Sequence, residues 1–179
     1  MELRAAEILI SEEQIRERVK VIGAEISERY RGQQLITIGI LRGAIIFMSD
    51  LVRAIDPSVD VRLEFMKASS YASSTISSGK VSISQPTLTS VEGKHVLIVE
   101  DIVDTGLTLK RLREYFAEQG ASSVEVCVLL DKKERRVVEV PVEYTGFVIP
   151  DEFVVGYGMD FDENWRNLPS IHIARTVEE

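Results

Sequence analysis

The clearest pattern near the N-terminus is a helical repeat of apolar residues. In SEEQIRERVKVIGAEISERYRG, residues 11–32, apolar side chains recur every three or four positions. Ser11 and Gln14 have the spacing of a capping box, in which each side chain bonds the backbone of the other residue. Gly32 is a typical helix stop. The pattern therefore predicts an amphipathic helix with one buried face.

Shorter apolar segments then alternate between strand and helix patterns through the middle of the chain. β-Branched runs and period-two alternation predict strands, whereas helical spacing predicts helices. The predicted strands are QLITIGIL (34–41), VDVRLEFMKA (59–68), KHVLIVED (94–101) and SSVEVCVLLD (122–131). The predicted helices are AIIFMSDLVRAID (44–56) and LTLKRLREYFAEQG (107–120). This alternation predicts an α/β fold around a mostly parallel central sheet flanked by helices.

Three segments depart from this alternation. SSYASSTISSG, which begins at Ser69, has little to bury and predicts a flexible loop at about 69–80, either a passive linker or a lid over a site. KVSISQPTL (80–88) predicts an edge strand, because Pro86 cannot donate to a ladder. The less regular tail (142–175) predicts a small hood subdomain of strands and loops. We expect a single domain over 1–179, with the terminal segments forming the hood.

Composition narrows the class of protein. The 179 residues include 21 basic and 29 acidic side chains, and the net charge of −8 disfavours binding to nucleic acid or to an anionic membrane. The single cysteine, Cys127, lies in a predicted strand and is expected in the core. No basic, apolar leader and no run of about eighteen apolar residues occurs. A soluble cytoplasmic protein is therefore expected.

The most informative segment is VLIVEDIVDTGLTL (96–109), where three carboxylates follow a buried strand. In an open parallel sheet, ligands bind beyond the carboxyl ends of the strands. The N–H groups at the start of the next helix can hold a phosphate, and Thr105, Gly106 and Thr108 can add hydroxyl groups and close backbone approach. Adjacent Glu100 and Asp101 suit a ribose diol or a hydrated magnesium ion. One ligand with both a sugar diol and a phosphate is indicated.

Simpler alternatives were weighed against this interpretation. Asp104 could merely cap the following helix through an Asx turn, but three acids within five residues favour a functional site. The chain contains no G-x-x-x-x-G-K-[ST] motif, and no G-x-G-x-x-G follows a strand. His95 opens a strand and His172 lies near the end, so neither suits a Ser-His-Asp hydrolase. Both histidines are expected to be structural or surface residues.

The same segment closely resembles the phosphoribosyl-pyrophosphate motif of the type I phosphoribosyltransferases. Three further segments are similar to the hypoxanthine-guanine branch of that family: LRGA (41–44) to its pyrophosphate loop, SSY (69–71) to its catalytic flexible loop, and PDEFVVGYGMDFDENWRNLP (150–169) to its purine-binding signature. The likeness extends from about Leu41 to Arg166. It implies transfer of ribose 5-phosphate from phosphoribosyl pyrophosphate to N9 of hypoxanthine or guanine, with Mg²⁺ as cofactor.

The resemblance also implies roles for residues at the donor end of the site. Glu100 and Asp101 would hold the ribose hydroxyls directly or through Mg²⁺, and Asp104 would accept a proton beside purine N7. The residues that would surround the 5′-phosphate are Asp104, Thr105, Gly106, Leu107 and Thr108. Those implied for the leaving pyrophosphate are Leu41, Arg42, Gly43 and Arg166.

For the base, the resemblance implies that Lys132 donates to the purine 6-oxo group. Phe153 would stack on the ring, and Val154 would recognise its edge through backbone groups. Asp160 would belong to the same purine site and bind a second Mg²⁺. Ser70 and Tyr71 would act from the catalytic loop, closing over the reactive sugar.

Three positions depart from the family pattern. The family's pyrophosphate loop commonly carries Lys and Gly where this chain has Arg42 and Ala44, and Ala44 is expected to resist a backbone angle that glycine adopts freely. The family implies a cis peptide bond between Leu41 and Arg42. Leu107 stands where many relatives have Lys, so phosphate binding is expected to depend on N–H groups and hydroxyls.

The resemblance also implies that the protein is a homodimer or a homotetramer. The alternative function is a non-catalytic regulator that binds phosphoribosyl pyrophosphate or nucleotides.

Overall fold

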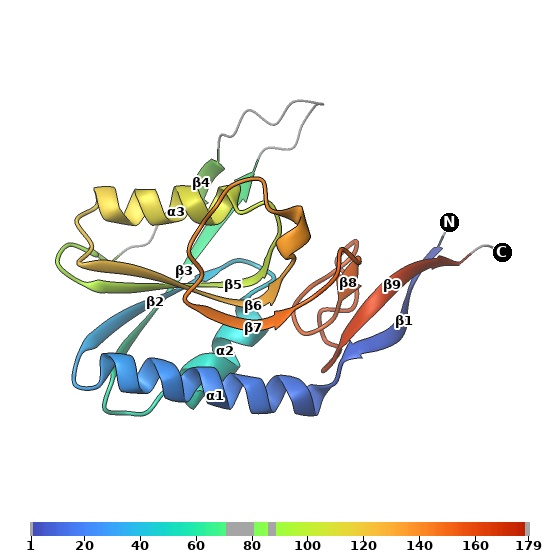
Figure 1. Ribbon diagram of the computed structural model, residues 1–179, viewed down its shortest axis with the longest axis horizontal. Helices are drawn as coiled ribbons and strands as arrows, with labels where there is room; N and C mark the ends of the chain where they lie inside the picture. The colour runs from blue at the N-terminus through green and yellow to red at the C-terminus, as the bar shows by residue number, and fades with distance from the viewer. Residues whose placement is uncertain (1, 71–80, 86–88, 178–179) are drawn as a thin grey trace.

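The computed structural model of the protein describes residues 2–70, 81–85 and 89–177. A six-stranded sheet has the spatial order β4-β3-β2-β5-β6-β7 (Figure 1). Its strands are β2 (Gln34–Ile40), β3 (Asp60–Ser70), β4 (Val81–Gln85), β5 (His95–Val103), β6 (Ser123–Asp131) and β7 (Tyr144–Val148). Five strands run parallel and β4 pairs antiparallel with β3. The mostly parallel α/β sheet predicted from the sequence is confirmed, and β4 is the expected edge strand.

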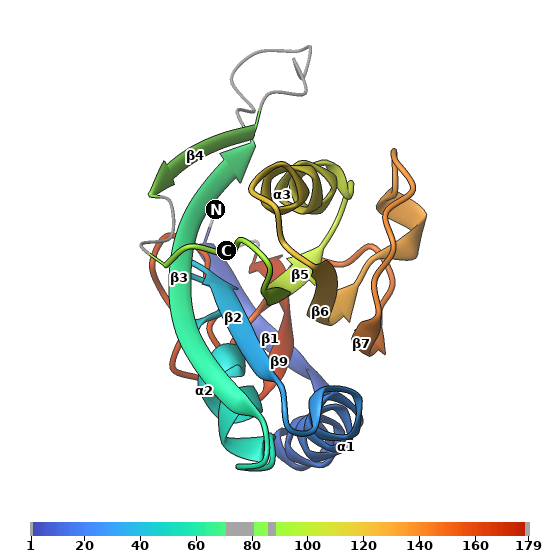
Figure 2. The same cartoon turned by 90° about the vertical axis from the view of Figure 1, so that its left-hand side faces the viewer.

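Helices cover both faces of this sheet (Figure 2). On one face lie α1 (Glu12–Tyr30) and α2 (Ile45–Ala54), and on the other lies α3 (Leu107–Glu118). The strands are apolar on both sides, so two core clusters form, one beneath α1 and α2 and one beneath α3. Because α2 follows β2 and α3 follows β5, the chain switches faces between these two neighbouring strands. The carboxyl ends of β2 and β5 therefore border a crevice of the kind that binds ligands in open sheets.

The first helix forms as its capping pattern predicts. Ser11 Oγ accepts a hydrogen bond from the Gln14 amide at 3.2 Å, and Gln14 Oε1 accepts one from the Ser11 amide at 2.9 Å. The helix runs to Tyr30, and Gly32 follows with a φ of 72°. Its buried side chains pack on the sheet and on α2. None of the helices in the described ranges is long and apolar enough to cross a membrane.

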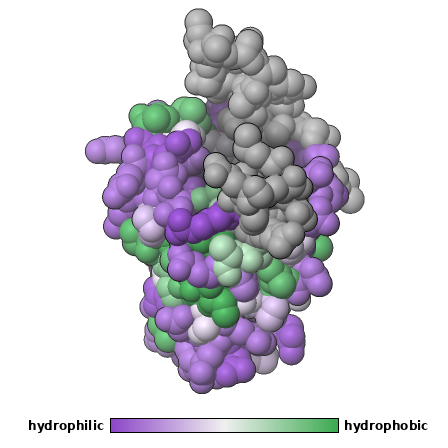
Figure 3. Space-filling view, turned by 90° about the vertical axis from the view of Figure 1, so that its right-hand side faces the viewer, coloured by the Kyte–Doolittle hydropathy of each residue, from purple (hydrophilic) through white to green (hydrophobic). Residues whose placement is uncertain are grey.

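A separate three-stranded sheet, the small sheet, has the order β1-β9-β8. It combines β1 (Glu2–Ile10), β9 (Ile171–Val177) and β8 (Val154–Val155), which brings the two chain ends together. In Figure 3, which looks onto this side of the molecule, hydrophobic residues lie in a band between hydrophilic regions above and below. β8 places the segment that follows Pro150 beside the carboxyl ends of the central strands.

Parts of the sequence prediction need correction. The tail was expected to form one hood, but β7 joins the central sheet beside β6, and only β8 and β9 enter the small sheet. The strand β3 continues to Ser70, two residues beyond the predicted end at Ala68. The predicted flexible loop falls mainly on residues 71–80, which lie outside the described residues.

Three expected structural residues are confirmed as such. Cys127 is fully buried in β6. His95 Nδ1 lies 2.8 Å from Ser123 Oγ, and His172 Nε2 lies 2.8 Å from Ser170 Oγ. His95 therefore bonds a residue of the neighbouring strand β6, and His172 bonds the residue just before its own strand β9; neither lines the cavity at the carboxyl ends of β2 and β5.

Candidate active site

A cavity of about 610 Å³ lies at the carboxyl ends of β2 and β5, between the central sheet and the segment that enters β8. Most of the residues singled out from the sequence line it. These nine are Arg42, Gly43, Asp101, Asp104, Lys132, Phe153, Val154, Asp160 and Arg166. Ile102, Arg135, Asp151 and Met159 complete the lining and were not singled out. Segments far apart in the sequence thus converge on one site.

The strand end that carries Glu100 and Asp101 brings only one of them to the cavity. Along β5, Leu97 and Val99 belong to the core beneath α1 and α2, and the alternate residues Val96 and Ile98 belong to the core beneath α3. This alternation does not continue to the end of the strand, because Ile102 packs against the first of these cores. Asp101 lines the cavity, whereas Glu100 does not.

Glu100 has an incompletely satisfied carboxylate. Its Oε2 is buried and has no hydrogen-bond partner among the described residues. Burial raises the pKa of Glu100 well above its usual value, and the negative charge of Asp101 adds to this effect. A buried acceptor without a donor is costly to the fold. Such an atom fits a site that gains a hydroxyl donor or a cation when the ligand binds.

The Asp101 carboxylate, unlike Oε2 of Glu100, has hydrogen-bonding and charged partners. Burial raises its pKa to about 6, although the Ile102 amide, which donates to Asp101 Oδ1 at 2.8 Å, and the charge of Arg166 act in the opposite direction. Gly43, in the turn after β2, lies so close that a Cβ there would overlap Asp101 Oδ2. A side chain at this point of the pyrophosphate-loop candidate would therefore force the Asp101 carboxylate to move. The contact ties the turn after β2 to the end of β5.

The loop between β5 and α3 has the form expected of a phosphate site, with one difference. Gly106 is the N-cap of α3 with a φ of 84°, and no side chain caps the helix. The alternative in which Asp104 is only a helix cap is therefore wrong. Thr105 Oγ1 accepts a weak hydrogen bond from the Leu107 amide at 3.4 Å. Residues 105–108 do not line the cavity but begin the helix that leads away from it.

The turn after β2 contains the unusual peptide bond that the resemblance implied. The bond between Leu41 and Arg42 is cis. Arg42, which lines the cavity, forms an ion pair with Glu163. Ala44 has a φ of −75° and is buried, so the expectation that alanine would strain this loop is wrong. Any residue can adopt that angle, and Ala44 serves as the N-cap of α2.

The loop after β8 brings a cation to the same cavity. Arg166 Nη2 lies 2.8 Å from Asp160 Oδ1, and Arg166 Nη1 donates to the Gly158 carbonyl at 2.8 Å. Its Nε is buried without a partner among the described residues. The Gly158 backbone in turn approaches Gly43 closely, because a Cβ on Gly158 would overlap the Gly43 carbonyl oxygen. Arg166 therefore has a donor left over beside the turn after β2.

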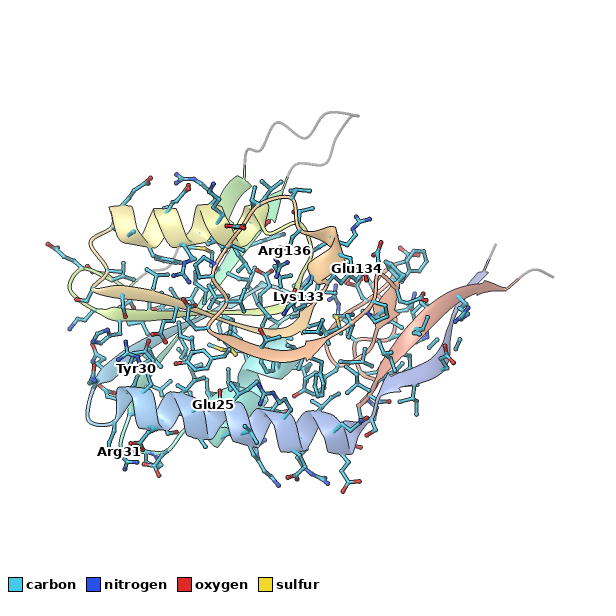
Figure 4. All side chains as sticks on the ribbon, in the orientation of Figure 1. Glu25, Tyr30, Arg31, Lys133, Glu134 and Arg136 are labelled. Carbon is cyan, nitrogen blue, oxygen red and sulfur yellow. The ribbon has the colours of Figure 1, made fainter. Side chains whose placement is uncertain are left out.

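The opposite wall of the cavity is formed by the turn after β6, where η1 (Lys133–Arg135) begins. Lys132 Nζ lies 3.3 Å from Asp151 Oδ1, and its side chain is 11% exposed. Arg135 Nε donates to Asp104 Oδ1 at 2.9 Å. Figure 4 shows this turn, with Lys133 and Arg136 labelled, at the end of the central sheet nearest the small sheet. The sequence signal for Arg135 was the basic cluster DKKERR, whose position relative to Asp104 could not be known.

An aromatic group borders the cavity on the side of β8. Phe153 is 49% exposed and meets Phe161 edge to face at 5.8 Å between ring centroids. Phe161 stacks on Trp165 at 6.4 Å. Val154, by contrast, is buried, and it pairs with Ile173 of β9. A large ring exposed to this extent at a cavity wall offers a flat apolar surface to a planar ligand.

The last three candidate residues are Leu41, Ser70 and Tyr71. Leu41 precedes Arg42 in the turn and does not line the cavity, and Ser70 is the last residue of β3. Tyr71 lies outside the described residues. Within the described ranges, no three His, Cys, Asp or Glu side chains converge as a preformed metal site. Mg²⁺ commonly uses only one or two protein carboxylates together with waters and phosphate oxygens.

Comparison with known proteins identifies the architecture. A family model described as the phosphoribosyl transferase domain matches residues 7–162. The chain belongs to the phosphoribosyltransferase family. Within this family, the hypoxanthine-guanine phosphoribosyltransferase of Streptococcus pneumoniae strain R6 is 49% identical over 168 residues, which cover 94% of this chain and 92% of the relative. The protein of the same name from Dictyostelium discoideum is 51% identical over 165 residues, covering 91% and 92%.

The fold of a solved phosphoribosyltransferase structure matches that of this chain over nearly the whole length of both. The hypoxanthine-guanine phosphoribosyltransferase of Bacillus anthracis, solved at 1.95 Å with a HEPES molecule in its active site, superposes with a TM-score of 0.91. It is 42% identical, and the match covers 98% of this chain and all of that one. The resemblance drawn from the sequence motifs, to the hypoxanthine-guanine branch of the phosphoribosyltransferases, is confirmed.

Proposed function

We propose that this protein transfers the 5-phosphoribosyl group from phosphoribosyl pyrophosphate to N9 of hypoxanthine, guanine or both, releasing pyrophosphate. The observation that carries the proposal is the cavity shared by four segments: the turn after β2, the end of β5, the turn after β6 and the segment through β8. Relatives about 50% identical carry the name of that activity. The reaction belongs to purine salvage, because it converts a free base into a nucleotide.

The sugar is proposed to bind at the end of β5. Asp101, which lines the cavity, and the adjacent Glu100 would accept hydrogen bonds from the ribose hydroxyls, directly or through Mg²⁺, with Asp160 as a further carboxylate for metal. Oε2 of Glu100 has no hydrogen-bond partner among the described residues, and burial raises the pKa values of Glu100 and Asp101. Both observations fit a site in which a bound cation or hydroxyl donor compensates these carboxylates. Bound Mg²⁺ would neutralise the charge of the phosphates.

The 5′-phosphate and the pyrophosphate of phosphoribosyl pyrophosphate are proposed to bind on opposite sides of the sugar. The 5′-phosphate would meet the amide groups of Asp104–Thr108 at the start of α3, where the helix dipole is positive. Because Leu107 supplies no charge, the Thr105 and Thr108 hydroxyls would add the remaining donors. The pyrophosphate would lie against the Leu41–Arg42–Gly43 turn and Arg166, whose free Nε can stabilise the negative charge that grows on the leaving group.

The purine is proposed to occupy the outer part of the cavity. Phe153 would stack on the ring, and backbone groups at Val154 would bind its edge. Lys132, held by Asp151, would donate to the 6-oxo group. Asp104 would accept the proton from N7 as N9 attacks the anomeric carbon. A loop closing from Ser70 and Tyr71 would exclude water from the reactive sugar.

Assembly and location remain part of the proposal. Ile45, Ile46 and Leu63 are large apolar residues that are 44%, 39% and 53% exposed. Apolar side chains on α2 and β3 suit a contact between subunits, which supports a homodimer or homotetramer. We expect no nucleic-acid or membrane partner on the basis of the net charge of −8. The cytoplasm is the expected location for an enzyme of base salvage.

Turnover tests the proposal directly. The protein is incubated with phosphoribosyl pyrophosphate, Mg²⁺ and, in parallel, hypoxanthine, guanine or xanthine, and the nucleotide formed is measured. We expect inosine or guanosine monophosphate together with one equivalent of pyrophosphate. Absence of product with every 6-oxopurine, accompanied by tight binding of the donor, would favour the alternative of a non-catalytic regulator.

A further inference from the structure

Four charged side chains form a continuous row along one wall of the cavity. Lys132 Nζ lies 3.3 Å from Asp151 Oδ1, and Arg135 Nη1 lies 3.4 Å from Asp151 Oδ2. Arg135 Nε donates to Asp104 Oδ1 at 2.9 Å. All four line the cavity. The row therefore joins the proposed partner of the purine 6-oxo group to the proposed proton acceptor at N7.

We propose that Arg135 is a positioning residue that fixes the Asp104 carboxylate toward the purine. The inference rests on the proposed function, in which Asp104 takes the purine proton. A carboxylate has two oxygens, and Arg135 bonds only Oδ1, so Oδ2 can accept a hydrogen bond from a ligand. A base whose orientation is fixed by a third group is a recurring arrangement in enzymes.

Arg135 and the neighbouring Arg136 act on different parts of Asp104. Arg136 Nη1 donates to the Asp104 carbonyl oxygen at 2.8 Å, and its Nη2 donates to Asp131. Arg136 therefore fixes the backbone of Asp104, whereas Arg135 fixes its side chain. Two arginines in succession thus leave the carboxylate little freedom on a loop that has no side-chain helix cap.

The energetics favour a role in orientation over a role in stability. The Arg135 and Asp104 side chains are 49% and 44% exposed. Exposed ion pairs contribute about 1 kcal/mol or less to folding. A planar guanidinium can engage Asp104 and Asp151 together, which the compact ammonium of a lysine does less well. Arginine is therefore the residue expected where one side chain must hold two carboxylates in fixed positions relative to each other.

Steady-state kinetics with matched variants tests the role. Arg135→Ala should lower kcat/KM for hypoxanthine by about tenfold or more, because misplacing a catalytic group is costly. Arg135→Lys should recover part of the loss. The KM for phosphoribosyl pyrophosphate should stay within about twofold in both variants, since that substrate is proposed to contact the backbone of the Asp104 loop and not the Asp104 carboxylate. Lys133→Ala removes a charge from the same exposed turn and should leave all constants within about twofold.

A double-mutant cycle separates this role from a general effect on the pocket. If Arg135 acts through Asp104, Arg135→Ala should change turnover by less than about twofold when Asp104→Asn is already present. Equal losses in the two backgrounds would overturn the proposal. So would an Arg135→Ala variant whose kcat/KM for hypoxanthine matches that of the parent protein.

A readout independent of turnover keeps the two proposals distinguishable. In protein labelled with ¹³C at aspartate carboxyl groups, the Asp104 signal is assigned by its loss in Asp104→Asn. Arg135→Ala should move this signal and Lys133→Ala should not. If the signal moves but the parent protein forms no nucleotide, the contact stands and the proposed function fails. If nucleotide forms and the signal does not respond, the positioning role is refuted.

Discussion

At the scale of single residues, the site depends on buried carboxylates whose charges are not fully compensated when no ligand is bound. Burial raises the pKa values of both Glu100 and Asp101, and Glu100 Oε2 is buried with no hydrogen-bond partner in the described part of the chain. A folded protein accepts such costs mainly where function requires them. These two residues should therefore affect stability and activity in opposite directions.

The pH dependence of stability follows from Asp101. The pKa of the Asp101 carboxyl is near its ordinary value of 3.8 in the unfolded chain and about 6 in the folded protein. Between these values the folded state binds more protons, so this group's contribution to the free energy of unfolding falls as the pH rises. Asp101→Asn should abolish that fall and make the protein more stable above pH 6, while slowing turnover.

Urea unfolding of the parent and the Asp101→Asn variant in metal-free buffer from pH 4 to 8 measures this effect. The stability difference between the two proteins should grow through the interval and then level off. Asp60→Asn is the control, because the pKa of Asp60 is lowered by its hydrogen bond from Gln34, and its difference should have the opposite sign. A stability difference for Asp101→Asn that does not depend on pH would contradict the raised pKa.

Asp104 gives a second prediction at this scale. Asp104→Asn keeps the shape of the side chain but removes the proton acceptor, so turnover should fall by about 10²-fold or more. Binding of phosphoribosyl pyrophosphate, measured by calorimetry, should change little because the amide groups of the loop remain. Turnover within about twofold of the parent would remove Asp104 from the proposed role.

At the scale of elements, the start of α3 is held from outside the helix. Val137 and Val138 amides donate to the Thr105 carbonyl, at 3.1 and 3.4 Å, and Arg136 links the Asp104 backbone to Asp131. The segment after β6 therefore fixes the loop that leads into α3, while the N-cap residue of the helix provides no side-chain cap. Asp131 is almost completely buried, and Arg136 is its charged partner.

Removing this link should destabilise the protein strongly. Arg136→Ala leaves a buried, uncompensated carboxylate, which typically costs about 3–5 kcal/mol. Replacing both members with apolar residues of similar size, as Arg136→Met with Asp131→Leu, should recover much of that loss. The control is Arg111→Ala on the exposed side of α3, expected to cost about 1 kcal/mol or less. Chemical unfolding measures all four proteins, and equal losses in Arg136→Ala and Arg111→Ala would contradict the link.

The elements also show what local sequence can determine. The helix that begins after Ser11 was predicted because its capping box and apolar face are local signals. The strand β1 was missed because ELRAAEILI acquires its structure by pairing with β9, about 165 residues away. The strand β7 was assigned to the wrong sheet for a similar reason. Its Gly146 fits against the Leu129 backbone, a contact that no local pattern contains.

At the scale of the whole molecule, nine of the residues singled out from the sequence line one cavity, but the sequence did not predict their arrangement. The motif of residues 96–109 located the crevice because ligands bind at the carboxyl ends of parallel strands. Sequence could not show that Asp101 lines the cavity whereas Glu100 does not, or that Arg135 reaches Asp104. Both depend on register and on a turn that returns from β6. Distances between chain segments are set by tertiary packing, which a single sequence does not encode locally.

The central claim is that the crevice between β2 and β5 binds a sugar phosphate, its purine and the leaving pyrophosphate together. A crystal structure with inosine monophosphate, pyrophosphate and Mg²⁺ tests it most directly. We predict the purine ring on Phe153, with Lys132 at its 6-oxo group and Asp104 at N7, and pyrophosphate beside Arg166. A nucleotide bound elsewhere, or one whose base contacts neither Lys132 nor Asp104, would contradict the claim.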